Sequence, residues 1–386
     1  MSGDDNAEQV EEEATNHGGM RIALAAPSGI GKTSVLAALL DEANTKVLAG
    51  SPVSVEAIGP TRRRLNRLKN ALQGHLRARE FVPGGIGGTQ SIQRYDLAIQ
   101  AALADRSFKL EFLDYPGGLL EGQEGESWKQ VRGWFRDADV LVLPVDATLL
   151  MEAVTPRQHQ RAQQLLDIAE IESVATRYWA KARAADDQPP GLLVIAPVKC
   201  ESYFDDNGGR RDRADALLER IRSSYGRLVE GVLAEAPGTE VLYCPIDTIG
   251  CVEVLRVEWP QPGQEDRHPV PHYRVRTEAQ LRQKGADDLF IALVRRIIGD
   301  ARQEQKSLAQ IARDEASKRR TSAEVRQGLL QNFWMWISGE RRRLRGAADR
   351  AEARAEQEQL ALQQLQETLQ AVSERPYSGR LRPFEA

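Results

Sequence analysis

Apolar residues along this chain fall into short continuous runs that are separated by longer amphipathic stretches. Such runs occur at 22–25, 140–145, 191–197 and 241–246, and the alternating segment Phe108–Leu113 ends at Asp114. Runs of this length without a polar face are typical of strands buried on both sides of a parallel sheet. Further strands are predicted at 51–58 and 92–99. The pattern predicts an α/β fold with a mainly parallel sheet, helices on both faces and a ligand site at the carboxyl ends of the strands.

Helical spacing occupies the stretches between these strands. A helix that opens at Pro60 places Leu65, Leu68, Leu72 and Leu76 on one face and covers the rest with arginine and lysine. Its basic face is expected in solvent, with a polyanion site as the alternative. Other helices are predicted at 127–136, 156–185 and 211–234, and helical spacing continues from 278 nearly to 373. The proline-rich segment 256–276 is predicted to be an irregular loop, with His268 and His272 as surface residues.

These patterns divide the chain into three parts. Residues 1–18 are acidic and almost without apolar residues, so they are predicted to be disordered. Residues 19–300 are predicted to form one domain with a basic helical insert at about 59–90. Residues 301–386 are predicted to be a helical extension. It carries a short coiled-coil seam that pairs with another chain or with the preceding helix, and it ends in a loose tail.

Composition narrows the partners and the cellular compartment that we expect. The formal net charge of −4 gives no general attraction to nucleic acid or to an anionic membrane. Three cysteines without paired spacing argue against a disulfide framework and for a cytoplasmic protein. No apolar stretch approaches the roughly 18–20 residues that span a bilayer. The first residues lack the basic and apolar pattern of a signal peptide, so none is expected.

The junction between the first strand and the first helix carries a phosphate-binding motif. Residues 26–33 read Ala-Pro-Ser-Gly-Ile-Gly-Lys-Thr, with alanine where the usual pattern begins with glycine. Backbone N–H groups of such a loop surround phosphate oxygens at a helix N-terminus. Lys32 is expected to reach the β- and γ-phosphates and Thr33 to bind Mg²⁺. The predicted nucleotide-binding residues here are Ser28, Gly29, Ile30, Gly31, Lys32, Thr33 and Ser34. The alternative is a glycine-containing turn with no ligand.

Two further segments suit a metal-bound triphosphate. Asp114 ends a buried-type strand and opens Asp-Tyr-Pro-Gly, so its carboxylate can hold the Mg²⁺ shell and the Gly117 N–H can reach the γ-phosphate. Thr89 ends a glycine-rich loop and is a second candidate for Mg²⁺, with a plain linker as the alternative. The predicted metal ligands are therefore Thr33, Thr89 and Asp114. The predicted catalytic groups are Lys32, Asp114 and Gly117.

Taken in order, these motifs resemble the G domain of the TRAFAC-class GTPases over roughly residues 20–300. Asp-Tyr-Pro-Gly and the insert before it are similar to the YcjX-like bacterial proteins. The resemblance implies that Lys199, Glu201 and the Asp247 loop bind guanine, although Val198 and Glu201 depart from the usual Asn/Thr-Lys-x-Asp pattern. It implies GTP or GDP with Mg²⁺ as ligands. ATP remains open because of that departure.

The resemblance also bears on activity and output. Gly118 stands where the family's catalytic glutamine is expected, which implies slow hydrolysis. A slow GTP-dependent switch, an ATPase of the same fold and a nucleotide-binding scaffold without turnover are the three hypotheses. Aromatic residues at 333–336 lie beside Arg341–Arg343. Residues 329–373 are predicted to dock on a partner protein or on a second copy. The alternatives are packing back on the core and contact with a membrane interface.

Overall fold

The structure is a computed structural model that describes residues 19–78, 92–102, 107–115, 125–185, 188–209, 211–264, 267–277, 279–318 and 348–385. Thr89, Gly117 and Gly118 lie outside the described residues, as do the predicted acidic tail and the aromatic segment at 329–337. No described helix has the length and apolarity that crossing a lipid bilayer requires.

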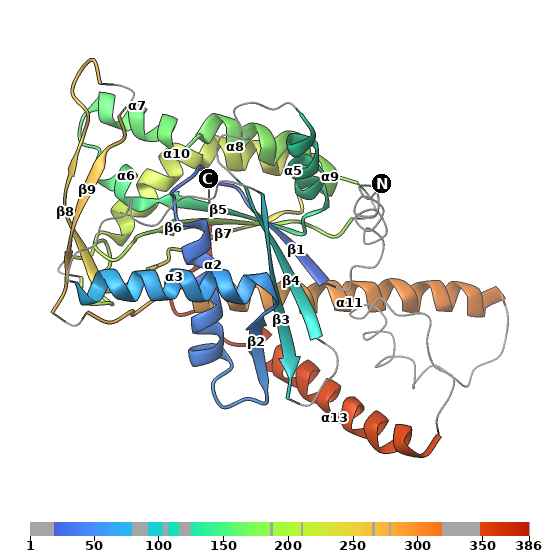
Figure 1. The fold of residues 1–386 in the computed structure, drawn as a ribbon. Helices are drawn as coiled ribbons and strands as arrows, with labels where there is room; N and C mark the ends of the chain where they lie inside the picture. The colour runs from blue at the N-terminus through green and yellow to red at the C-terminus, as the bar shows by residue number, and fades with distance from the viewer. Residues whose placement is uncertain are drawn as a thin grey trace, which may run out of the picture.

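An eight-stranded sheet forms the centre of the fold, in the order β10-β7-β6-β5-β1-β4-β3-β2 (Figure 1). The strands are β1 Gly19–Leu24, β2 Val53–Ala57, β3 Gln93–Ala101, β4 Ser107–Asp114, β5 Val140–Asp146, β6 Leu192–Val198, β7 Glu240–Tyr243 and β10 Arg382–Pro383. The five central strands run parallel, while β3, β2 and β10 are antiparallel to their neighbours. Every residue of β5 and β6 is buried, which explains their unbroken apolar runs. The α/β fold predicted from these runs is confirmed.

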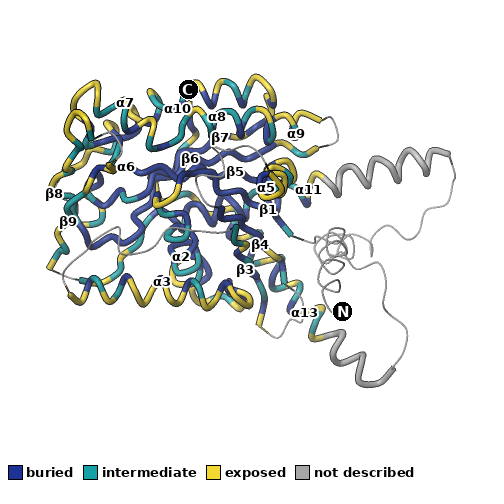
Figure 2. Tube along the Cα trace, turned by 45° about the horizontal axis from the view of Figure 1, so that its top comes forward, coloured by how far each residue is buried: buried dark blue, intermediate teal, exposed yellow. Residues whose placement is uncertain are grey.

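Helices cover both faces of this sheet (Figure 1). The helices are α2 Lys32–Glu42, α3 Pro60–Arg77, α5 Glu126–Asp137, α6 Ala147–Met151, α7 Pro156–Leu165, α8 Ile168–Val174, α9 Lys181–Arg183, α10 Ala214–Glu235, α11 Ala286–Lys318 and α13 Ala348–Ser373. One layer contains α2, α3, α11 and α13, and the other contains α5, α8 and α10. The four leucines of α3 are buried as predicted, and most of the rest of this helix is exposed (Figure 2).

The predicted single helix over 156–185 is wrong, because the chain breaks it after α7. Asp167 adopts a left-handed conformation, with φ at 47°, which ends one helix and starts α8 at a new angle. A π-helical segment, Ala175–Ala180, then leads into α9. Trp179 in this segment is fully buried, and its indole Nε1 donates to the Ala138 carbonyl at 2.9 Å. Packing of this large side chain against the sheet thus overrides a regular helical repeat.

The predicted irregular loop at 256–276 is wrong near both of its ends, which belong to the two strands of a hairpin, while the described connection between them is not in a strand. Strands β8 Val252–Glu258 and β9 Val270–Val275 pair in an antiparallel two-stranded sheet with a register shift between Val254 and Arg256. A strand in a two-stranded ribbon has one unpaired side, so proline can be accommodated without losing a ladder bond. Pro271 accordingly lies within β9, and Pro260 and Pro262 lie in the connection. The next helix, α11, begins at Ala286 instead of near 278.

The C-terminal residues join the core, so the predicted loose tail is wrong. Helix α13 packs on α11 and buries one side of its last turns, at Ala361, Leu365, Leu369 and Val372. The described part of the predicted seam therefore packs against the preceding helix. Beyond α13, β10 extends the sheet beside β7, and Leu381 and Phe384 are buried. The predicted domain boundary at residue 300 falls inside α11.

Candidate functional site

The phosphate-binding motif forms a tight loop between β1 and α2, as predicted. Gly29 and Gly31 have φ angles of 78° and 119°, a region that residues with a Cβ rarely adopt. Ala26 is buried and has no positive φ, which explains why alanine can replace the usual first glycine. Gly31 is the N-cap of α2, and as a glycine it places no side chain on the N-terminal amides of this helix. Those amides are suited to an anion.

Lys32 lies at the base of this loop with its side chain only 5% exposed. Its Nζ donates to the carbonyl oxygens of Ala26 at 2.7 Å and Pro27 at 3.2 Å. It lies 3.6 Å from Asp114 Oδ1 and 5.0 Å from the centre of the Tyr115 ring. Burial lowers the pKa of Lys32, while the Asp114 carboxylate favours its charged form. The structure therefore fixes an ammonium group directly beneath the loop.

Thr33 and Asp114 come together from different elements, as the sequence predicts for a metal site. Thr33 Oγ1 donates to Asp114 Oδ2 at 3.1 Å, and Asp114 is fully buried at the end of β4. A hydroxyl and a carboxylate are hard oxygen ligands of the kind that Mg²⁺ prefers, with the remaining positions filled by water and phosphate oxygens. The described residues contain no cluster of three or more His, Cys, Asp or Glu side chains that would hold a metal on its own. The donor set therefore fits Mg²⁺ bound together with a phosphate ligand.

Lys199 directly follows β6 and lies beside the phosphate loop. Its Nζ lies 3.5 Å from the Gly29 carbonyl oxygen and forms a short ion pair with Asp146. Asp146 ends β5, and its other oxygen caps α6 by accepting from the Thr148 N–H at 2.9 Å. Sequence reasoning gave Asp146 no role. The available signal was an aspartate at the end of a buried strand, the same signal that identified Asp114.

Glu201 is buried at 2% exposure and braces a neighbouring loop. Its Oε1 accepts from the backbone N–H groups of Ile249 at 2.8 Å and Gly250 at 3.2 Å. Burial, followed by the nearby Asp247 carboxylate, raises the pKa of Glu201 to about 7. Gly250 has a φ of 82°, and a Cβ there would lie 1.8 Å from the Arg282 carbonyl oxygen, so only glycine fits this turn.

Asp247 lies behind this loop and is fully buried. Its Oδ2 accepts from Asn207 Nδ2 at 2.8 Å and from Arg380 Nη2 at 3.0 Å. The structure thus brings Asp247 to Glu201 but gives its carboxylate partners within the protein. Arg380 was missed by sequence reasoning, which placed it in a loose tail.

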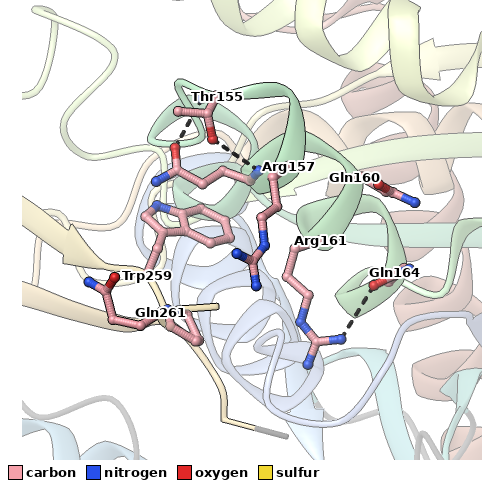
Figure 3. A pocket seen from close by; sticks show the side chains of 9 residues that line it. Thr155, Arg157, Gln160, Arg161, Gln164, Trp259 and Gln261 are labelled. Atoms are coloured by element: carbon pink, nitrogen blue, oxygen red, sulfur yellow. Dashed lines mark hydrogen bonds between the residues drawn. The ribbon is translucent and has the colours of Figure 1, made fainter. Parts of the chain in front are cut away.

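A separate hollow of about 360 Å³ lies between α7 and the connection that follows β8 (Figure 3). Trp259 forms one wall, and Arg157 and Arg161 project from α7 on the same side (Figure 3). The Trp259 indole Nε1 donates to the Glu152 carbonyl at 3.2 Å, which fixes the ring. None of the residues that line this hollow belongs to the phosphate loop or to the Glu201 cluster, so it is not the nucleotide site.

Comparisons with known proteins give low-level structural likenesses only. No protein-family model matches the chain, and no curated protein sequence matches it. Solved structures of the S. cerevisiae Ski7 GTPase-like domain, with GDP and inorganic phosphate or with GTP, align at 15% and 14% identity with TM-scores of 0.34 and 0.32. The two alignments cover 62% and 61% of this chain and 45% and 44% of the Ski7 chains. This chain therefore spans less than half the length of those proteins.

The cytosolic domain of the T. maritima FeoB iron transporter, in its GMPPNP form, aligns at 11% identity with a TM-score of 0.22, over 92% of this chain and 97% of that one. Scores this low carry no argument about function. The chain itself supplies the argument, because a phosphate loop between β1 and α2 and an aspartate at the end of β4 stand on a mainly parallel sheet. The protein has an α/β fold with a phosphate loop between β1 and α2, and no particular family is shown.

Proposed function

We propose that the protein is a nucleotide-dependent switch that binds GTP with Mg²⁺ at the carboxyl edge of its sheet and hydrolyses it slowly. The arrangement of Lys32, Thr33 and Asp114 carries this proposal. It joins a buried ammonium, a hydroxyl and a carboxylate beneath a loop whose glycines have positive φ. A triphosphate would exchange the carbonyl partners of Lys32 for phosphate oxygens, and Mg²⁺ would lie between Thr33 and Asp114.

Glu201, in the loop that follows β6, supports guanine as the base that is bound. Its Oε1 is held by the backbone N–H groups of Ile249 and Gly250, which fixes the carboxylate beside the loop that follows β7. Guanine presents two adjacent donors, N1–H and the 2-amino group, to such an acceptor, whereas adenine has an acceptor at N1. A buried acceptor left unpaired by the wrong base costs affinity, about 10²-fold or more where it is well desolvated. ATP remains the alternative ligand.

Slow turnover follows from the residues that would orient water. The residue after Gly117 is Gly118, which has no side chain to hold the attacking water. A partner that supplies the missing group would turn the slow enzyme into a regulated switch. The face of α13 that carries Leu365 and Leu369 is already used by the core. Any output surface within 329–373 therefore uses other residues of that segment.

Calorimetry with GTP, GDP and ATP, each with and without Mg²⁺, tests the proposal. Lys32→Ala should weaken GTP binding at least 10- to 100-fold, because a hydrogen bond to a charged group contributes about 1.5–3 kcal/mol. Lys69→Ala is the matched control, since Lys69 is exposed and pairs with the surface carboxylate of Asp41. Unchanged affinity in Lys32→Ala, or a wild-type protein that binds no nucleotide, would contradict the proposal.

A further inference from the structure

The segment after α13 returns to the back of the candidate base site. Ser378 is tied to Asp288 at the start of α11 through its N–H at 2.7 Å. Strand β10 then pairs with β7, and the Phe384 N–H donates to the Val241 carbonyl at 2.9 Å. This path carries Arg380 into the space behind the loops that follow β6 and β7.

Arg380 is 5% exposed and contacts both of these loops. Its Nε donates to Asp206 Oδ2 at 2.9 Å, and its Nη2 contacts the other Asp206 oxygen and Asp247 Oδ2, the latter at 3.0 Å. The guanidinium also lies 4.1 Å from the centre of the Phe204 ring. One planar cation therefore joins two carboxylates that belong to different loops, an arrangement that a rigid guanidinium favours.

The two joined loops are the ones that hold the predicted base-binding residues. Asp206 and Asn207 follow Lys199 and Glu201 in the loop after β6. Asp247 directly precedes the Thr248–Gly250 turn whose amides bind Glu201. Asn207 adds a second link between the two loops, because its Nδ2 donates to Asp247 Oδ2 at 2.8 Å as well as to the Arg282 carbonyl at 2.8 Å.

Charge balance gives Arg380 a second effect on this site. Asp247 is fully buried near Glu201 and disfavours the ionised form of that residue. Without the guanidinium, Asp247 would keep only a neutral amide partner among its described hydrogen bonds. A buried carboxylate without its cation is strongly unfavourable, so the loop would move to expose it.

We propose that Arg380 is a positioning residue for base recognition. It holds the loops after β6 and β7 together, so that binding of the base depends on the C-terminal segment and binding of the phosphates does not. This inference rests on the proposed function. It predicts that replacing Arg380 weakens recognition of the base and leaves binding of the phosphates unchanged. Phosphate contacts, which depend on Lys32, Thr33 and Asp114, should remain.

The test compares three ligands on the full chain: GTP, ATP and inorganic tripolyphosphate, each with Mg²⁺. Arg380→Gln should weaken GTP binding 10- to 100-fold and bring the GTP-to-ATP affinity ratio close to one, while tripolyphosphate affinity stays within about twofold. Arg380→Lys should recover part of the ratio, because an ammonium can satisfy one carboxylate. Arg382→Gln, two residues along on β10 and 41% exposed, is the control and should change nothing.

A second variant keeps the test decisive if Arg380→Gln does not fold. Asp206→Asn removes the ion pairs of the more exposed partner, whose side chain is 37% exposed, with Arg380 and with Lys284, and should lower the GTP-to-ATP ratio in the same direction. If wild type binds GTP and a folded Arg380→Gln or Asp206→Asn protein keeps the wild-type ratio, the role of Arg380 is overturned and the proposed function stands. A wild-type protein that binds tripolyphosphate but no nucleotide overturns both.

Discussion

Leu369 and Leu360 lie on the same helix, α13, in opposite environments. Leu369 is 0% exposed and Leu360 is 58% exposed. Replacing Leu369 with alanine removes three carbon atoms from the core, and at ~0.8 kcal/mol for each buried methylene-sized group their transfer alone costs roughly 2.4 kcal/mol. The remaining cavity adds to this, so we expect Leu369→Ala to lower the free energy of unfolding by about 3–4 kcal/mol. Leu360→Ala makes the same change in helix propensity and should cost within ~0.5 kcal/mol.

Urea unfolding followed by far-UV circular dichroism measures the difference. With a denaturant slope near 3 kcal/mol/M, at the upper end of the usual range for urea, Leu369→Ala should unfold about 1 M earlier than wild type. Leu360→Ala should unfold with wild type. If both variants share the wild-type midpoint, α13 is not packed on the core in solution. The C-terminal residues would then form the separate extension that their sequence predicts.

Three further results are expected. Glu42 is 1% exposed, and burial raises its pKa from 4.5 to about 7, so the folded state favours the neutral acid and loses about 3 kcal/mol of stability as pH rises from 4.5 to about 7; Glu42→Gln should flatten the pH dependence of urea midpoints over that range, and parallel profiles would refute this. Gly250→Ala should lower the melting temperature far more than Gly263→Ala, because both glycines have positive φ but only at Gly250 would a Cβ meet backbone, at 1.8 Å. GTP affinity should rise between pH 6 and 8 as Glu201, with its pKa near 7, ionises, whereas ATP affinity in calorimetry should not follow that curve.

The central sheet and the phosphate loop could be predicted because their signals are local. A strand buried on both faces is apolar throughout, as β5 and β6 are, and the loop motif occupies eight consecutive residues. The errors arose where local signals mislead. Prolines in 256–276 indicate a loop, but the unpaired sides of a two-stranded ribbon accept them. A strand of two residues, such as β10, has no periodicity to detect.

The base side of the site depends on contacts between distant parts of the chain, which no spacing reveals. Arg380 is separated from Asp247 by 133 residues and from Asp206 by 174. Asp146 similarly meets Lys199 only because β5 and β6 are neighbours in the sheet. The roles of Glu201 and Asp247 in binding a base stay predictions. Their positions beside each other are features of the fold that the motif did not specify.

The central place of β1 determines when the phosphate loop can form during folding. Strand β1 pairs with β4 on one side and β5 on the other, and the Arg21 N–H also donates to Asp139, 118 residues away in sequence. Pairings this distant form slowly, because a long segment must close before they contribute. The loop, although built from eight adjacent residues, is therefore completed only with the middle of the sheet. Amide hydrogen exchange in β1 should be as slow as the slowest in the protein. Opening the end of the phosphate loop that continues from β1 should require nearly global unfolding.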